Sequence, residues 1–152
     1  MLALAGLAAG WLRCERLIAR RNFLRAFIRF LNTLSTALRY SGEDIFTLVT
    51  QSADFLEMNA AESSKPFAAV WTDAVRPLSR RYALHRQDTE LLAAFGERLG
   101  TTDLEGQLSH IELYQTLFAK QETNAEDDIG KKSKLYKAMG LFVGVSAAIM
   151  LV

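Results

Sequence analysis

The sequence predicts an all-α protein, a helical bundle of about five helices with a long C-terminal helix running into a membrane anchor. Three observations support this fold class. Leucines recur every seven residues from Leu17 to Leu38, no segment shows the alternation of a strand, and no proline follows Pro77. The 152 residues fit one domain, and the formal net charge of +1 gives the chain no general attraction for nucleic acid.

The first three predicted helices are separated by turn signals. The leucine stripe predicts a helix over residues 17–38. Ser41 is then expected to cap a second helix, whose apolar face runs over residues 45–56. Pro66 suits the first turn of a third helix, and Pro77 should end it, because proline is tolerated in a first turn but breaks a helix interior.

A tight corner is predicted between the fourth helix, over residues 91–99, and the long helix that follows. Gly100 suits the left-handed residue that terminates a helix. Thr102 and Glu105 have the spacing of a capping box, which would start the long helix. The apolar side of that helix is expected to face the core through Leu104, Leu108 and Ile111.

The two ends of the chain resemble membrane segments. Residues 1–12 and 139–152 carry no charge, arginines follow the first run, and lysines precede the second. By the positive-inside rule both flanks of the middle belong in the cytoplasm. The predicted division is a short N-terminal membrane segment over residues 1–12, a cytoplasmic helical domain over 13–134 and a C-terminal membrane segment over 135–152. The alternative is that both ends are buried in a soluble core, as apolar runs of this length often are.

The N-terminal run is short for a membrane span. As a helix, residues 1–12 extend about 18 Å, whereas the bilayer core is about 30 Å thick. Either the natural protein begins upstream of Met1 or this end inserts only shallowly, and an upstream start is the expectation. Each run also contains glycines four residues apart, which let helix backbones approach closely. Helix packing in the membrane is therefore expected at Gly6, Gly10, Gly140 and Gly144.

Motifs for catalysis and for cofactor binding are missing. The sequence contains no phosphate-binding G-x-x-x-x-G-K-[ST] loop and no G-x-S-x-G nucleophile elbow. His85 and His110 have no metal-ligand partner four residues later, and Cys14 is the single cysteine. The sequence therefore predicts no enzyme activity, no cofactor and no metal site.

Two sets of polar residues have open interpretations. Asp103, Gln107, His110 and Tyr114 share one side of the long helix. They form either a recognition face for a partner or a set of hydrogen-bonding groups at the edge of the bundle. A row of arginines, Arg21, Arg25 and Arg29, forms either a solvated face near acidic lipid headgroups or a match for the acidic surface of a partner.

The corner region resembles the hallmark of the stage III sporulation protein AB family, a G-E-x-L-G-x-x-D-x-x-x-Q-x-x-H-I-like stretch. In this sequence the stretch begins at Gly96 and ends at Ile111, and a lysine-bearing approach to an apolar end follows it. The residues that carry the resemblance, and that form the possible partner face, are Gly96, Glu97, Leu99, Gly100, Asp103, Gln107 and His110.

The resemblance implies a function. It implies a non-enzymatic, membrane-anchored component of the mother cell–forespore channel, a secretion-like complex required for endospore formation. The location would be the mother-cell membrane facing the forespore. The implied partners are membrane lipid and other subunits of the complex, with its ATPase and a second copy of the chain as candidates. The alternative is a soluble or peripheral helical regulatory protein whose apolar ends pack into a core or a dimer.

Overall fold

A computed structural model describes residues 2–58 and 65–150, with side chains over 14–58 and 65–132. The described residues form helices and no strand, which confirms the all-α fold class. The helices are α1 (Leu2–Tyr40), α2 (Ile45–Ser52), α3 (Phe67–Val75), α4 (Leu78–Arg81), α5 (Arg86–Arg98) and α6 (Leu104–Met150). The single-turn helix α4 is the one element that the sequence did not predict.

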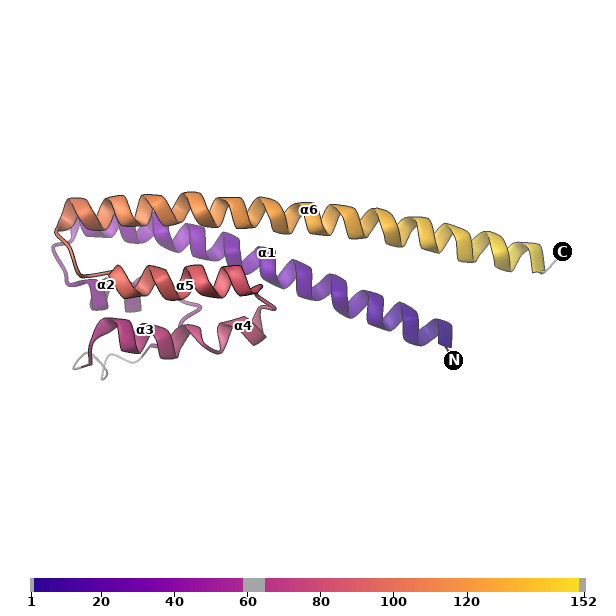
Figure 1. Ribbon diagram of the computed structural model, residues 1–152, viewed down its shortest axis with the longest axis horizontal. Coiled ribbons are helices and arrows are strands. Elements are labelled where there is room, and N and C mark those ends of the chain that lie inside the picture. The colour runs from indigo at the N-terminus through magenta and orange to yellow at the C-terminus, as the bar shows by residue number, and fades with distance from the viewer. Residues whose placement is uncertain (1, 59–64, 151–152) are drawn as a thin grey trace.

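Helices α1 and α6 form the long axis of the molecule (Figure 1). They run antiparallel and share the largest helix–helix interface of the described chain. The shorter helices lie on one side of this pair, where α2 packs on α1, α5 packs on α6, and α3 packs on α5. Because α1 and α6 are antiparallel, the first residues of α1 and the last residues of α6 lie at the same end of the molecule, beyond the shorter helices (Figure 1).

An aromatic cluster centred on Phe27 joins the helices. The Phe27 ring centroid lies 4.4 Å from that of Phe118 on α6 and 5.7 Å from that of Phe95 on α5. It also contacts Trp71 of α3 edge-on at 6.3 Å. The predicted leucine stripe of α1 is confirmed, since Leu17, Leu24 and Leu31 are buried and Leu38 packs against the same core. One continuous core therefore connects α1, α3, α5 and α6.

The start of α2 differs from the prediction. Asp44, not Ser41, is the N-cap residue: its Oδ1 accepts hydrogen bonds from the backbone N–H groups of Phe46 at 2.5 Å and Thr47 at 3.4 Å. Ser41 instead accepts a bond from the backbone N–H of Glu43. The helix begins at Ile45, so the capping position falls on the aspartate directly before it.

The long helix α6 is confirmed and continues through Gly130 to Met150 without a break. Within residues 2–58 and 65–150, no helix combines the length and the apolar character needed to cross a bilayer. The four glycines of the predicted membrane helix contacts, Gly6, Gly10, Gly140 and Gly144, lie outside the residues whose side-chain surroundings the structure describes.

Candidate functional site

The residues that carry the family resemblance meet at the corner between α5 and α6. Helix α5 ends at Arg98, and Leu99 follows in an extended conformation with its side chain buried. Gly100 then adopts φ of +81°, the left-handed conformation that the sequence predicted for it. Glu97 lies at the surface. The chain can therefore reverse within a few residues and start α6 at Leu104.

Gly96 lies directly against the indole ring of Trp71. A Cβ atom at position 96 would lie 1.9 Å from Cδ1 of that ring, a distance that no real contact allows. Trp71 is fully buried, and its Nε1 donates a hydrogen bond of 2.7 Å to the carbonyl oxygen of Leu92. This bond and the missing Cβ fix how closely α3 approaches α5.

Asp103 caps α6. Its Oδ1 accepts a hydrogen bond of 3.0 Å from the backbone N–H of Gly106, and its carbonyl oxygen accepts one from that of Gln107. The predicted capping box of Thr102 and Glu105 is therefore wrong, because the helix begins one residue later than such a box requires.

Gln107 is buried inside the corner. Its Oε1 accepts a hydrogen bond of 2.9 Å from the backbone N–H of Gly100. Its Nε2 donates to the carbonyl oxygen of Thr102 at 3.3 Å and to the Thr102 hydroxyl at 3.0 Å. Since the side chain is only 4% exposed, it holds the two ends of the turn together from within.

His110 contacts α5. Its ring stacks on Phe95 with a centroid distance of 5.4 Å and an interplanar angle of 10°. Because a carbonyl oxygen can only accept, His110 Nε2 donates the 2.9 Å hydrogen bond to the backbone of Phe95. The Tyr114 ring lies beside it, and burial raises the pKa of this phenol.

The predicted polar set on α6 is only partly exposed. Gln107 and Tyr114 are buried, His110 is half-buried, and Asp103 is exposed. Gln107 bonds to the backbone of Gly100 and Thr102, and His110 bonds to that of Phe95, so both side chains help to hold the corner together. Leu104, predicted to face the core, is 48% exposed, whereas Ile111 is fully buried and Leu108 half-buried. A docking role for Gln107 and His110 stays a prediction.

Replacing Asp103 by alanine should lower the free energy of unfolding by about 1 kcal/mol, because the first turn of α6 loses its acceptor. Asp103→Asn keeps an acceptor oxygen and should stay close to the wild-type value. Glu105→Ala should leave stability nearly unchanged. Urea unfolding of the full chain in detergent measures all three variants. If Glu105→Ala lowers the free energy of unfolding more than Asp103→Ala does, the predicted capping box of Thr102 and Glu105 is correct after all.

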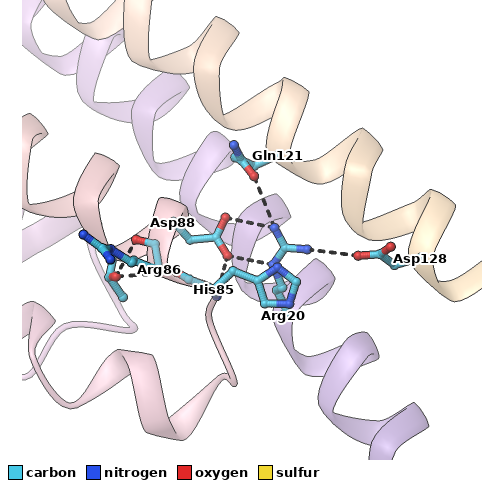
Figure 2. A network of polar contacts seen from close by, with 7 residues as sticks. Arg20, His85, Arg86, Asp88, Gln121 and Asp128 are labelled. Carbon is cyan, nitrogen blue, oxygen red and sulfur yellow. Dashed lines mark hydrogen bonds and ion pairs between the residues drawn. The ribbon is translucent and has the colours of Figure 1, made fainter.

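A second cluster, which the sequence analysis missed, is an ion pair buried between α1 and α5 (Figure 2). Arg20 donates from Nε to Asp88 Oδ2 at 2.6 Å and from Nη2 to Asp88 Oδ1 at 3.0 Å. Its Nη2 also reaches Gln121 of α6 at 3.2 Å. The side chains of Arg20 and Asp88 are 2% and 0% exposed. Three helices are thus joined at one bidentate pair.

The rest of this cluster leaves one polar atom without a hydrogen bond. Asp88 Oδ2 also accepts from the backbone N–H of His85 at 2.8 Å, which ties the pair to the start of α5. Arg20 Nη1 has no hydrogen-bond partner and lies 3.8 Å from Asp128 Oδ2 on α6 (Figure 2). Because the side chains of Arg20 and Asp88 are buried, water has little access to the pair, and its charges depend on protein partners for stabilisation.

The sequence did contain a signal for the pair. Arg20 lies three residues after Leu17 and four before Leu24, so it falls on the buried stripe of α1. Asp88 likewise lies four residues before Leu92, on the buried face of α5. Charged residues at core positions of two helices indicate a buried pair.

Within the arginine row, Arg25 has a role that neither interpretation predicted. Arg25 donates from Nε to Glu122 at 2.5 Å and from Nη2 to Glu126, and both partners are on α6. The acidic surface that faces Arg25 is thus supplied by the chain itself. Arg29 is exposed, and Arg21 bonds to its neighbour Asn22.

Metal ligands do not gather anywhere in the part of the chain that the structure describes: no three histidine, cysteine or acidic side chains lie close enough together to hold an ion.

The surface near the corner has a pocket of about 230 Å³ beside His110 and Leu113. Leu113, which lines this pocket, is 55% exposed.

Comparison with known proteins identifies the family. No solved structure gives a significant match. The chain is 28% identical over 109 residues to stage III sporulation protein AB of Bacillus subtilis (strain 168). That match covers 72% of this chain and 61% of the relative, so the chain spans less than two thirds of the relative's length. The model of the stage III sporulation protein AB family matches residues 1–152. The chain belongs to the stage III sporulation protein AB family.

Proposed function

We propose that this protein is a non-enzymatic, membrane-anchored component of the mother cell–forespore channel, a secretion-like complex of endospore formation. Its two ends would insert into the mother-cell membrane that faces the forespore, and the bundle would lie in the cytoplasm. Membership of a sporulation protein family supports the cellular context. The partners proposed are membrane lipid and other subunits of the complex, with its ATPase and a second copy of the chain as candidates.

The antiparallel pairing of α1 and α6 is the observation that carries this proposal. It brings the uncharged residues 2–12 and 139–150 to the same end of the molecule, each continuous with a helix of the bundle (Figure 1). A hairpin anchored at both ends needs this arrangement. A four-helix connection, residues 45–98, could instead have left the two ends on opposite sides of the domain.

Basic residues near these ends add to the support. Arg16 on α1 and Lys131 and Lys132 on α6 are exposed. Arg20 and Arg25, which also follow the first apolar run, are engaged by Asp88 and Glu122 and therefore add little charge for lipid. Glu15, beside Arg16, is exposed as well, so this support rests mainly on Lys131 and Lys132 before the second apolar run, as expected for the cytoplasmic side of a membrane.

The bundle itself supports a role in assembly. Gly96 lets α3 approach α5 closely. Asp103 caps the start of α6, and Gln107 holds the turn between α5 and α6. The buried pair of Arg20 and Asp88 then joins α1 to α5, next to α6. These contacts make a rigid support for the two ends, which is the property that a scaffold subunit requires.

Membrane fractionation tests the anchoring step. The full chain in sporulating cells should sediment with membranes, resist a high-salt wash and need detergent for release. Ala8→Asp combined with Val145→Asp places a charge in each uncharged run and should move the protein to the soluble fraction, because a carboxylate in the bilayer costs about 3 kcal/mol or more. Ala119→Asp, at an exposed position of α6, is the matched control and should stay in the membrane.

The outcome separates the two functional classes. If the wild-type chain is released by salt or stays in the soluble fraction, anchoring is wrong and the soluble or peripheral regulator takes its place. If anchoring holds, capture of the full chain with detergent from sporulating cells should bring down other membrane subunits of the complex. The Ala8→Asp/Val145→Asp variant should fail to complement a null mutant in a spore count.

A further inference from the structure

We propose that the pocket between α1 and α4 binds the phosphate headgroup of an anionic membrane lipid, an inference that rests on the membrane anchoring proposed above. The pocket measures about 540 Å³. Arg16 on α1 and Arg80 and Arg81 on α4 line it, together with the hydroxyl of Ser79 and one acidic side chain, Glu15. We name this group of residues the α1–α4 pocket.

The α1–α4 pocket has an excess of positive charge. Arg16 and Arg80 are exposed, and neither makes an ion pair in the part of the chain that the structure describes. Arg81 bonds to Glu57 at 3.1 Å and lies over the ring of Tyr82, which leaves its remaining N–H groups near the pocket. Guanidinium groups match phosphate oxygens in planar, bidentate pairs, so these residue types fit a phosphate better than a carboxamide or a sugar.

The location of the α1–α4 pocket matches the depth of a headgroup. Arg16 lies four residues after Leu12, the last residue of the first uncharged run, and both belong to the continuous helix α1. Four residues of helix rise about 6 Å, and the headgroup layer on each side of a bilayer is about 5–8 Å thick. If Leu12 lies at the edge of the hydrocarbon core, Arg16 lies at the depth of the lipid phosphates. Helix α4 lies towards this same end of the bundle (Figure 1).

The wall formed by α4 is held in place by the core. Leu78 and Leu84, on either side of the basic turn, are buried. The backbone N–H of Leu84 donates to the carbonyl oxygen of Ser79 at 3.0 Å, and Ala83 between them adopts φ of +52°. Because this turn is fixed, Ser79 and Arg80 can be presented without the entropic cost of ordering a loop on binding.

Calorimetric titration of the full chain in a neutral maltoside detergent tests the proposal. Dihexanoyl phosphatidylglycerol should bind saturably, and Arg16→Gln/Arg80→Gln should raise its Kd by about thirtyfold, as expected for two lost arginine contacts. Arg29→Gln/Arg39→Gln removes the same charge from exposed positions farther along α1 and should change the Kd by no more than about twofold. Dihexanoyl phosphatidylcholine should bind far more weakly, since its headgroup has no net charge.

The inference is overturned by equal binding of the two lipids, by no saturable binding, or by an unchanged Kd in the Arg16→Gln/Arg80→Gln variant. If inorganic phosphate displaces phosphatidylglycerol at equal concentration, the ligand is free phosphate and the lipid assignment is wrong. The titration needs no anchoring, and the fractionation test with Ala8→Asp/Val145→Asp needs neither arginine. A failure of lipid binding at the α1–α4 pocket can therefore be distinguished from a failure of membrane anchoring.

Discussion

Asp88→Ala should lower the free energy of unfolding by about 3–5 kcal/mol. The substitution leaves the guanidinium of Arg20, which is 2% exposed, without its bidentate acceptor. Gln121 and Asp128 remain, but one offers a single hydrogen bond and the other lies 3.8 Å away. Loss of the carboxylate also frees the backbone N–H of His85. Urea unfolding of the full chain in detergent, followed by circular dichroism, measures the change.

Two further variants separate burial from charge. Arg20→Met/Asp88→Leu removes both charges together and should be much less destabilised than Asp88→Ala, because no buried charge is left alone. Asp73→Ala breaks the exposed ion pair with Arg76, whose side chains are 75% and 73% exposed, and should cost less than about 1 kcal/mol. If Asp88→Ala costs as little as Asp73→Ala, water reaches Arg20 and the pair does not hold the helices together.

The helices were predictable because their periodicity is strong. The leucines of α1 and the apolar residues of α6 repeat over many turns, so the pattern is clear whatever the helix packs against. Helix α4 has four residues, which is too short for a period to be seen. Both N-caps were assigned to a hydroxyl residue upstream of the true cap, Ser41 for Asp44 and Thr102 for Asp103. Competing polar residues next to a helix start leave its first residue ambiguous in sequence.

The candidate site was predicted only in part for a different reason. Gly100 was identified because a left-handed residue after a helix has a local signature. The role of Gly96 depends on Trp71, which lies on another helix, and no local pattern reports that contact. Arg20 was grouped with the basic residues after the first apolar run, since arginine is seldom buried. Its place on the leucine stripe did indicate burial, but its partners Asp88 and Gln121 lie on α5 and α6, and no local pattern reports those contacts.

Gly96→Ala should destabilise the protein by about 3 kcal/mol, the upper end of the cost of overpacking a core. The added methyl group would lie 1.9 Å from Trp71 Cδ1 and 2.4 Å from Nε1, so the indole or the whole of α3 must move. Such a movement also strains the 2.7 Å bond from Nε1 to the Leu92 carbonyl oxygen. The effect is opposite to the usual one, since alanine normally favours a helix interior over glycine by about 1 kcal/mol.

Gly130→Ala supplies the matched control in α6. Nothing lies within 4 Å of a Cβ atom built at that position, so the same substitution should raise stability by about 0.5–1 kcal/mol there. Opposite signs for the two variants, measured by thermal unfolding of the full chain in detergent, would show that the close approach of α3 to α5 requires Gly96. In a Trp71→Leu background, Gly96→Ala should cost much less than it does in the wild type, because the smaller side chain makes room for the methyl group. If Gly96→Ala is as stabilising as Gly130→Ala, the indole is free to shift, and the glycine of the family motif has a role other than packing.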